Sequence, residues 1–177
     1  MRAQTPIISV FGSSRPREGD ADYEDARELG RALAAHGFRV CSGGYGGVME
    51  AVSRGAKEAG GSTLGITAEF FQSHANRWVD DEIHVGTWEE RLFELIRRGD
   101  GFVACKGGTG TLVELAVVWE MLNKSVMARK PFVVLGDLAA DSRARARGRT
   151  RASLELGRIE RGLGAHRAGS STGSRLS

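Results

Sequence analysis

The sequence predicts an α/β protein, a single domain in which helices cover both faces of a doubly wound, mostly parallel sheet. Apolar runs alternate with amphipathic stretches from residue 7 to residue 136, which is the order that repeated βα units produce. The strand-like runs are continuously apolar, as expected of strands buried on both faces. Three of these runs end in glycine-rich turns, which is typical of a Rossmann-like fold.

The first half of the chain alternates between strand and helix. The run "IISVFG" is short, apolar and ends in glycine. The helix that follows it repeats Ala26, Leu29 and Leu33 on one face and stops at Gly37. We expect strands at residues 7–12, 38–44 and 62–67, and helices at 22–37 and 48–60.

The second half repeats this pattern after a polar loop. The stretch "TWEERLFELIRRGD" places Trp88, Leu92, Leu95 and Ile96 on one side of a helix. A strongly apolar helix follows the third glycine-rich turn. We expect strands at residues 83–85, 101–105 and 130–136, and helices at 87–100 and 111–123.

The regular pattern stops after Gly136. Residues 139–177 carry nine arginines and three acidic residues, so this segment accounts for the positive net charge of the chain, +3. We therefore divide the chain into a nucleotide-binding domain, 1–138, and a basic low-complexity tail, 139–177, that is disordered or non-native. A basic arm for nucleic acid is the alternative. We favour a non-native tail, and so argue against a nucleic-acid partner.

Composition excludes several other classes. Hydrophobic residues make up 41% of the chain and charged residues 27%, the profile of a soluble globular protein. No apolar run reaches the roughly 20 residues that a membrane helix needs, and the first run is too short for a secretion signal. We expect a cytoplasmic protein without membrane contact. Cys41 and Cys105 end apolar runs and fit buried, unreactive thiols better than disulfide or zinc chemistry.

The three glycine-rich turns are "FGSSRP" (11–16), "SGGYGG" (42–47) and "KGGTGT" (106–111). Glycine lets backbone N–H groups approach an anion closely, and a helix N-terminus adds a partial positive charge. A single turn of this kind can serve packing alone, but three at strand ends predict a phosphate site. Lys106 precedes its glycines, which excludes a Walker motif, and the first turn lacks G-x-G-x-x-G. A mononucleotide or sugar phosphate fits better than NAD.

Two charged residues are candidates for chemistry. Glu114 lies one helical turn after Thr111, within reach of a ribose whose phosphate occupies the turn. It also fits the reciprocal partner of a capping box, with Thr111 as the helix N-cap. Arg91 lies among several charges in "WEERLFELIRR", which would ordinarily form a solvated face.

These motifs together resemble the LOG ("lonely guy") family, often labelled lysine decarboxylase-like. "KGGTGTLVE" resembles the PGGxGTxxE motif of that family, and "WEER" takes the place of its M-x-x-R-K element. "VFGSSRP", "SGGYGGVMEAVSRGAKEAGGSTLGIT" and "KPFVVLGD" resemble further family segments, so that the resemblance spans residues 7–137. Two positions differ: Lys106 replaces the motif proline, and Leu92 replaces the lysine after the family arginine.

The resemblance implies hydrolysis of the N-glycosidic bond of a nucleoside 5′-monophosphate, AMP-like or cytokinin-like, giving free base and ribose 5-phosphate. By analogy Glu114 and Arg91 are catalytic, and no metal or other cofactor is needed. The family also implies a homodimer. The alternative is a protein of the same fold that binds a nucleotide or nucleotide-like cofactor without turning it over. The expected substrate-binding residues are Ser13, Gly43, Gly44, Gly107, Gly108, Thr109, Gly110 and Thr111.

Overall fold

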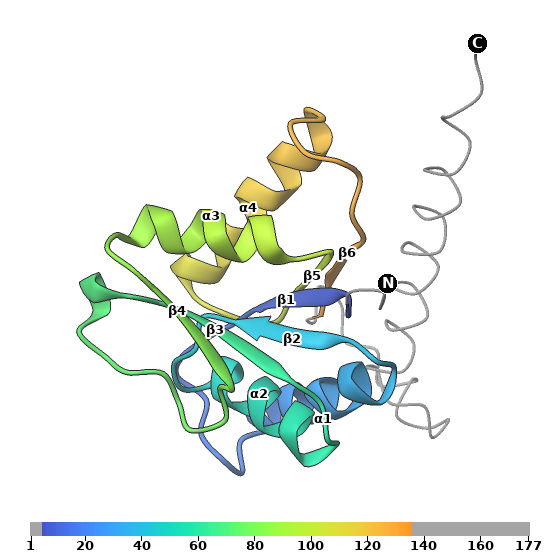
Figure 1. The fold of residues 1–177 in the computed structure, drawn as a ribbon, viewed down its shortest axis with the longest axis vertical. Coiled ribbons are helices and arrows are strands. Elements are labelled where there is room, and N and C mark those ends of the chain that lie inside the picture. The colour runs from blue at the N-terminus through green and yellow to red at the C-terminus, as the bar shows by residue number, and fades with distance from the viewer. Residues whose placement is uncertain (1–4, 136–177) are drawn as a thin grey trace.

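A six-stranded parallel sheet forms the centre of the computed structural model, which describes residues 5–135 (Figure 1). The strand order is β4-β3-β2-β1-β5-β6, and every neighbouring pair is parallel. The chain therefore starts in the middle of the sheet, runs to one edge and then returns to the other, as in doubly wound folds. The strands are β1 (Ile7–Phe11), β2 (Arg39–Ser42), β3 (Thr63–Ala68), β4 (Asp81–Val85), β5 (Gly101–Ala104) and β6 (Phe132–Val134).

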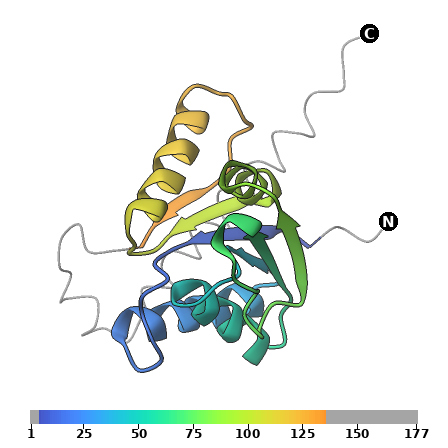
Figure 2. The same cartoon turned by 90° about the vertical axis from the view of Figure 1, so that its left-hand side faces the viewer.

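Two pairs of helices cover the two faces of the sheet (Figures 1 and 2). One face carries α1 (Ala21–Ala35) and α2 (Val48–Glu58), and the other carries α3 (Trp88–Arg98) and α4 (Thr109–Asn123). A short 3-10 turn, η1 (Glu69–Phe71), follows β3. This arrangement confirms the predicted α/β fold class. Every predicted strand and helix is present, with boundaries shifted by a few residues. The predicted domain boundary and the tail 139–177 lie outside the described residues.

Alternate side chains of the strands feed two hydrophobic cores. On the α1/α2 face, Ile8 and Val10 of β1 pack with Leu29 and Leu33 of α1. On the other face, Phe11 stacks on Phe102 at 6.1 Å between ring centroids. The amphipathic faces predicted for the helix around residues 87–100 follow this division, because Leu92, Leu95 and Ile96 belong to the second core. Both faces of the central strands are thus buried, which explains their continuously apolar sequence.

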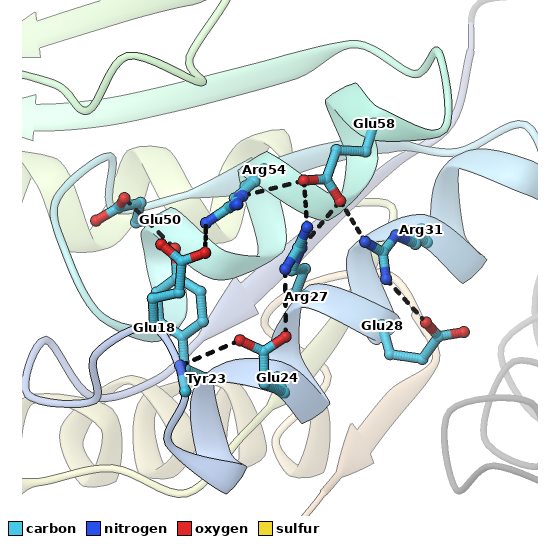
Figure 3. Close-up of polar contacts among 10 residues, drawn as sticks. Glu18, Tyr23, Glu24, Arg27, Glu28, Arg31, Glu50, Arg54 and Glu58 are labelled. Carbon is cyan, nitrogen blue, oxygen red and sulfur yellow. Dashed lines mark hydrogen bonds and ion pairs between the residues drawn. The ribbon is translucent and has the colours of Figure 1, made fainter.

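The helices α1 and α2 are joined by backbone contact and by surface charge. A Cβ atom on Gly55 would lie 1.8 Å from the carbonyl oxygen of Arg27, so only glycine permits this approach. Above the contact, Glu58 accepts from the guanidinium groups of Arg27, at 2.6 Å, and Arg54, at 3.0 Å, and also pairs with Arg31 (Figure 3). These arginines lower the pKa of Glu58 to about 2, with the Arg27 hydrogen bonds as the largest cause.

Two smaller expectations can be compared with this structure. Cys41 is fully buried, and burial raises the pKa of both Cys41 and Cys105 to about 12, which fits unreactive thiols. Among residues 5–135, no helix combines the length and the apolarity that crossing a bilayer requires.

Candidate active site

The three glycine-rich turns meet at the carboxyl edge of the sheet. The Ser13 N–H of the first turn donates to the Lys106 carbonyl of the third turn at 3.3 Å. The Ser13 carbonyl accepts from the Val48 N–H, at the start of α2, at 2.8 Å. A Cβ atom on Gly47 would lie 2.3 Å from that carbonyl, so the second turn can close onto the first only with glycine there. Segments more than 90 residues apart in sequence thus form one surface.

The third turn leads into α4 differently from the prediction. The helix begins at Thr109 with Gly108 as its N-cap, and no side chain caps it. Thr111 is therefore not the N-cap, and Glu114 closes no capping box. The Thr111 side chain instead folds back on the turn, where a Cβ atom on Gly107 would lie 2.1 Å from its hydroxyl oxygen. Without a capping side chain, the first N–H groups of α4 keep their capacity to bind an anion.

A capping box does form at the start of α3. The Thr87 hydroxyl accepts from the Glu90 N–H at 3.1 Å, while the Glu90 carboxylate accepts from the Thr87 N–H at 3.1 Å. This box fixes where α3 begins and therefore which residue of its first turn points to the carboxyl edge. That residue is Arg91.

Arg91 is buried rather than part of a solvated face, with 6% of its surface exposed. Its Nε donates to the Ile66 carbonyl at 2.8 Å, and its Nη2 approaches the Met49 sulfur at 3.6 Å. Its Nη1 lies 3.7 Å from the Glu114 carboxylate, an ion pair longer than a hydrogen bond. Burial lowers the pKa of Arg91, and the charge of Glu114 acts against this shift. The structure thus brings the two predicted catalytic residues together.

Gly43 makes room for Arg91. A Cβ atom at this position would lie 1.6 Å from the Arg91 Nη2 atom, so that any other residue would displace the guanidinium group. Gly44, with φ of +77°, occupies the left-handed region, and its carbonyl accepts from the Asn76 backbone N–H at 2.7 Å. Of the two glycines predicted to bind substrate, Gly43 thus has a positioning role for Arg91, while Gly44 shapes the turn itself.

Glu114 occupies an environment that disfavours its charge. Its side chain is 13% exposed, and burial raises its pKa to about 7, with the charge of Arg91 opposing the shift. A carboxyl group of this kind exchanges its proton near neutral pH. Residues with strongly shifted pKa values in a polar edge of a parallel sheet are candidates for catalysis.

The prediction did not include the aromatic neighbours of Arg91. The rings of Tyr45 and Phe71 each lie 5.4 Å from the Arg91 guanidinium carbon, measured to the ring centroids. Asn76 holds this region by donating from Nδ2 to the carbonyls of Gly44 and Tyr45 at 3.0 and 2.9 Å. One signal was available in the sequence, since Tyr45 is an aromatic residue within a glycine-rich turn.

The two positions that differ from the LOG pattern have clear structural surroundings. The Lys106 ammonium group lies 3.1 Å from the Asp22 carboxylate in the first turn of α1, and its side chain is largely exposed. Leu92 is buried in the core of the α3/α4 face. Among the described residues, neither side chain forms a hydrogen bond or an ion pair with Arg91 or Glu114.

Two hollows differ in their relation to these turns. A polar hollow of about 520 Å³ lies between the first and second turns, where Ser14, Gly46 and Gly47 line it together with Arg15 and Arg17. A larger apolar hollow of about 800 Å³ lies between α3 and α4, with Phe93 and Met121 in its lining, and includes none of the site residues. In the described part of the chain, no group of three or more His, Cys, Asp and Glu residues is arranged to hold a metal ion.

The fold and the three joined turns define a Rossmann-like protein whose polar site lies at the carboxyl edge of a parallel sheet. The chain belongs to the SLOG cluster4 family, whose model matches residues 5–154. This match, together with the relatives described next, confirms the resemblance to LOG proteins.

Three relatives illustrate what this chain is similar to. The cytokinin riboside 5′-monophosphate phosphoribohydrolase of Mycobacterium tuberculosis is 32% identical over 115 residues, which cover 63% of this chain and 61% of that enzyme. The solved molybdenum cofactor binding protein of Rippkaea orientalis is 30% identical, with a TM-score of 0.65 and 88% of each chain covered. The Moco carrier protein of Chlamydomonas reinhardtii is 26% identical, with a TM-score of 0.68, and the match covers 92% of this chain and 99% of that one.

Proposed function

We propose that the protein hydrolyses the N-glycosidic bond of a nucleoside 5′-monophosphate and releases the free base and ribose 5-phosphate. The observation that carries this proposal is the buried pair of Arg91 and Glu114, 3.7 Å apart, beside an uncapped helix start. The name of the M. tuberculosis relative supports the same reaction. AMP and its cytokinin-like N6-substituted analogues are the proposed substrates.

The phosphate binds at the third turn. The backbone N–H groups between Gly107 and Thr111 lack a capping side chain, and the helix dipole of α4 adds a partial positive charge there. The hydroxyls of Thr109 and Ser13 supply further donors at the joined first and third turns. Glu114 lies one helical turn further along α4, so a phosphate held at the turn places the ribose beside its carboxylate.

The reaction breaks the bond between C1′ of the ribose and the base nitrogen. The electron pair of that bond leaves with the base, and a positive oxocarbenium-like charge develops on the sugar. The Glu114 carboxylate stabilises this charge and holds the ribose hydroxyls. The Arg91 guanidinium group donates a hydrogen bond to the departing base and keeps its own protons. Water is divided between the products: its hydroxide adds to C1′, and its proton goes to the base nitrogen.

A second function has specific support. The molybdenum cofactor binding protein of R. orientalis covers 88% of the chain, and Lys106 and Leu92 depart from the LOG pattern. In this alternative the same edge holds a nucleotide or nucleotide-like cofactor, without hydrolysis. The turns would then bind phosphate as before, and Arg91 would act as a ligand for the cofactor rather than as a catalyst.

We also propose that the protein forms a homodimer through α4. This helix is strongly apolar, yet Leu112 and Trp119 on its outer side are 63% and 65% exposed. Apolar side chains exposed along one helix mark an interaction surface more often than scattered single ones do. The Trp119→Lys variant is expected to sediment as a monomer where the unmodified protein sediments as a dimer. A wild-type protein that sediments as a monomer at all concentrations contradicts this proposal.

The decisive experiment incubates the full chain with a panel of nucleoside 5′-monophosphates and measures free base by chromatography. Base release is expected from the wild type and is expected to be lost in Glu114→Gln and Arg91→Lys. Matched controls on the same helices are Glu120→Gln and Arg98→Lys, both exposed and outside the site. Tight nucleotide binding without base release in the wild type would reject the hydrolase in favour of the carrier.

A further inference from the structure

The carboxyl edge of the sheet carries two exposed phenylalanines. Phe70 and Phe71, in the turn η1 after β3, are 68% and 41% exposed. Single exposed apolar residues need no explanation, but these two lie side by side among small and polar residues, next to the buried Arg91. Their place beside the proposed catalytic pair raises the question of what covers them.

The two phenylalanine rings pack in a row with a third ring, that of Tyr45. Phe70 contacts Phe71 edge to face at 5.2 Å between centroids, and Phe71 contacts Tyr45 at 5.4 Å. The Tyr45 hydroxyl accepts from the Ala68 N–H at 2.9 Å and donates to the Ala68 carbonyl at 3.1 Å. The innermost ring is therefore held at both its backbone and its hydroxyl, so that Phe71 packs against a fixed neighbour before any ligand arrives.

The groups along this edge follow the order of a nucleotide. The uncapped start of α4 comes first, then Glu114, then Arg91 at 3.7 Å from it, and then Phe71, whose ring centroid lies 5.4 Å from the Arg91 guanidinium carbon. A nucleoside 5′-monophosphate presents phosphate, ribose and base in the same sequence. With its phosphate at the turn and its ribose at Glu114, the base of such a ligand is directed toward Arg91 and the ring of Phe71.

We infer that the ring of Phe71, which Tyr45 and Phe70 contact edge to face, is the stacking surface for the base of the ligand, and that it selects purines over pyrimidines. This inference rests on the proposed nucleotide site but not on turnover. A flat aromatic surface attracts every base through its π-face, and the two fused rings of a purine cover more of it than a pyrimidine does. Phe71 is thus a specificity-determining residue, while Arg91 and Glu114 act on the bond.

The test measures affinity by titration calorimetry on the full chain with AMP, UMP and ribose 5-phosphate, in the Glu114→Gln background so that AMP is not consumed. Phe71→Leu retains apolar bulk but removes the flat ring, so AMP affinity is expected to fall roughly fivefold to hundredfold, in proportion to a lost stacking contact. The preference for AMP over UMP is expected to shrink, and ribose 5-phosphate, which has no base, is expected to bind as before. Phe71→Trp is expected to restore the preference.

Phe93→Leu is the matched control, because Phe93 is an exposed phenylalanine on α3 that contacts none of the three rings. Equal losses for AMP and ribose 5-phosphate in Phe71→Leu would overturn the inference by marking a structural role. Unchanged AMP affinity would also overturn it, and so would a changed oligomeric state, which would assign the rings to a protein contact. AMP binding that depends on Phe71, together with no base release from the unmodified protein, would support the inference while rejecting the hydrolase.

Discussion

Glu58 and Glu114 both face arginine side chains, yet the pKa values of their carboxyl groups are shifted in opposite directions. Glu58 lies on the outside of α2 and pairs with three arginines at short distances, which lower its pKa to about 2 (Figure 3). Glu114 lies at the carboxyl edge with one arginine at 3.7 Å, and burial raises its pKa to about 7. Solvent and close arginine partners stabilise the charge of Glu58, whereas burial destabilises the charge of Glu114. The first site is therefore suited to holding helices together, and the second to chemistry.

The largest expected effect is on activity, and it distinguishes the proposed catalytic role of Glu114 from the structural role of Glu58. Glu114→Gln keeps the shape of the side chain but removes the charge that is proposed to face the ribose. Base release should fall by roughly 10²- to 10³-fold, the usual cost of losing one electrostatic contact to a transition state. Glu58→Gln should leave the rate within about twofold, because the charge is distant from the edge. Equal effects of the two changes would remove the distinction.

Gly43→Ala should disrupt the site although the substitution replaces no charged residue. The added Cβ atom would lie 1.6 Å from the Arg91 Nη2 atom, so the guanidinium group must leave its present position beside Glu114. We expect base release to fall at least about tenfold and the free energy of unfolding to fall by about 1–3 kcal/mol, as for overpacked positions. Steady-state rates and urea unfolding measure the two effects. Gly46→Ala is a matched control, since nothing crowds a Cβ atom there more closely than 3.9 Å.

The pH dependence of activity tests the raised pKa of Glu114. If the Glu114 carboxylate is the active form, kcat/KM should rise as the pH increases through about 7 and then level off.

Glu114 also affects stability, because its pKa is higher in the folded chain than the ordinary value near 4.5. The folded state then binds the additional proton, so this group makes stability fall as the pH rises from about 4.5 to about 7. Glu114→Gln should flatten that slope in urea unfolding.

The smallest expected effect concerns Glu58. Its pKa is lowered in the folded chain, so its contribution to stability is present above the unfolded value and is lost as the pH falls toward about 2. Glu58→Gln should lower the free energy of unfolding at pH 7 by about 1 kcal/mol, since the pairs lie at the surface. The loss should shrink in high salt. A loss that is insensitive to salt would contradict this account of the α1–α2 contact.

The sequence predicts the fold well because the central strands are buried on both faces and glycine follows closely after α1, α2 and α3. Short-range patterns of this kind are visible in consecutive residues such as those of β1 and α1. The start of the helix after the third turn is predicted less well. The pattern of Thr111 and Glu114 matches a capping box, but the helix starts two residues earlier, and a pattern alone does not fix a helix start.

The geometry of the site depends on contacts that sequence order does not reveal. Arg91 is surrounded by Ile66, Met49 and Glu114, which come from three other elements of the fold. Its burial follows from that convergence, whereas its local sequence is that of a charged surface helix. The role of Gly43 is hidden for the same reason, because the atom that requires the space lies 48 residues further along the chain. Only the packed sheet brings these residues together.

The pairing of Lys106 with Asp22 has a consequence for how the third turn is held. A proline at this position would stiffen the turn through its ring, whatever the solvent. Here an exposed ion pair at 3.1 Å ties the turn to α1, and such pairs weaken as ions screen them. The stiffness of this turn thereby becomes a property of the surrounding electrolyte as well as of the chain.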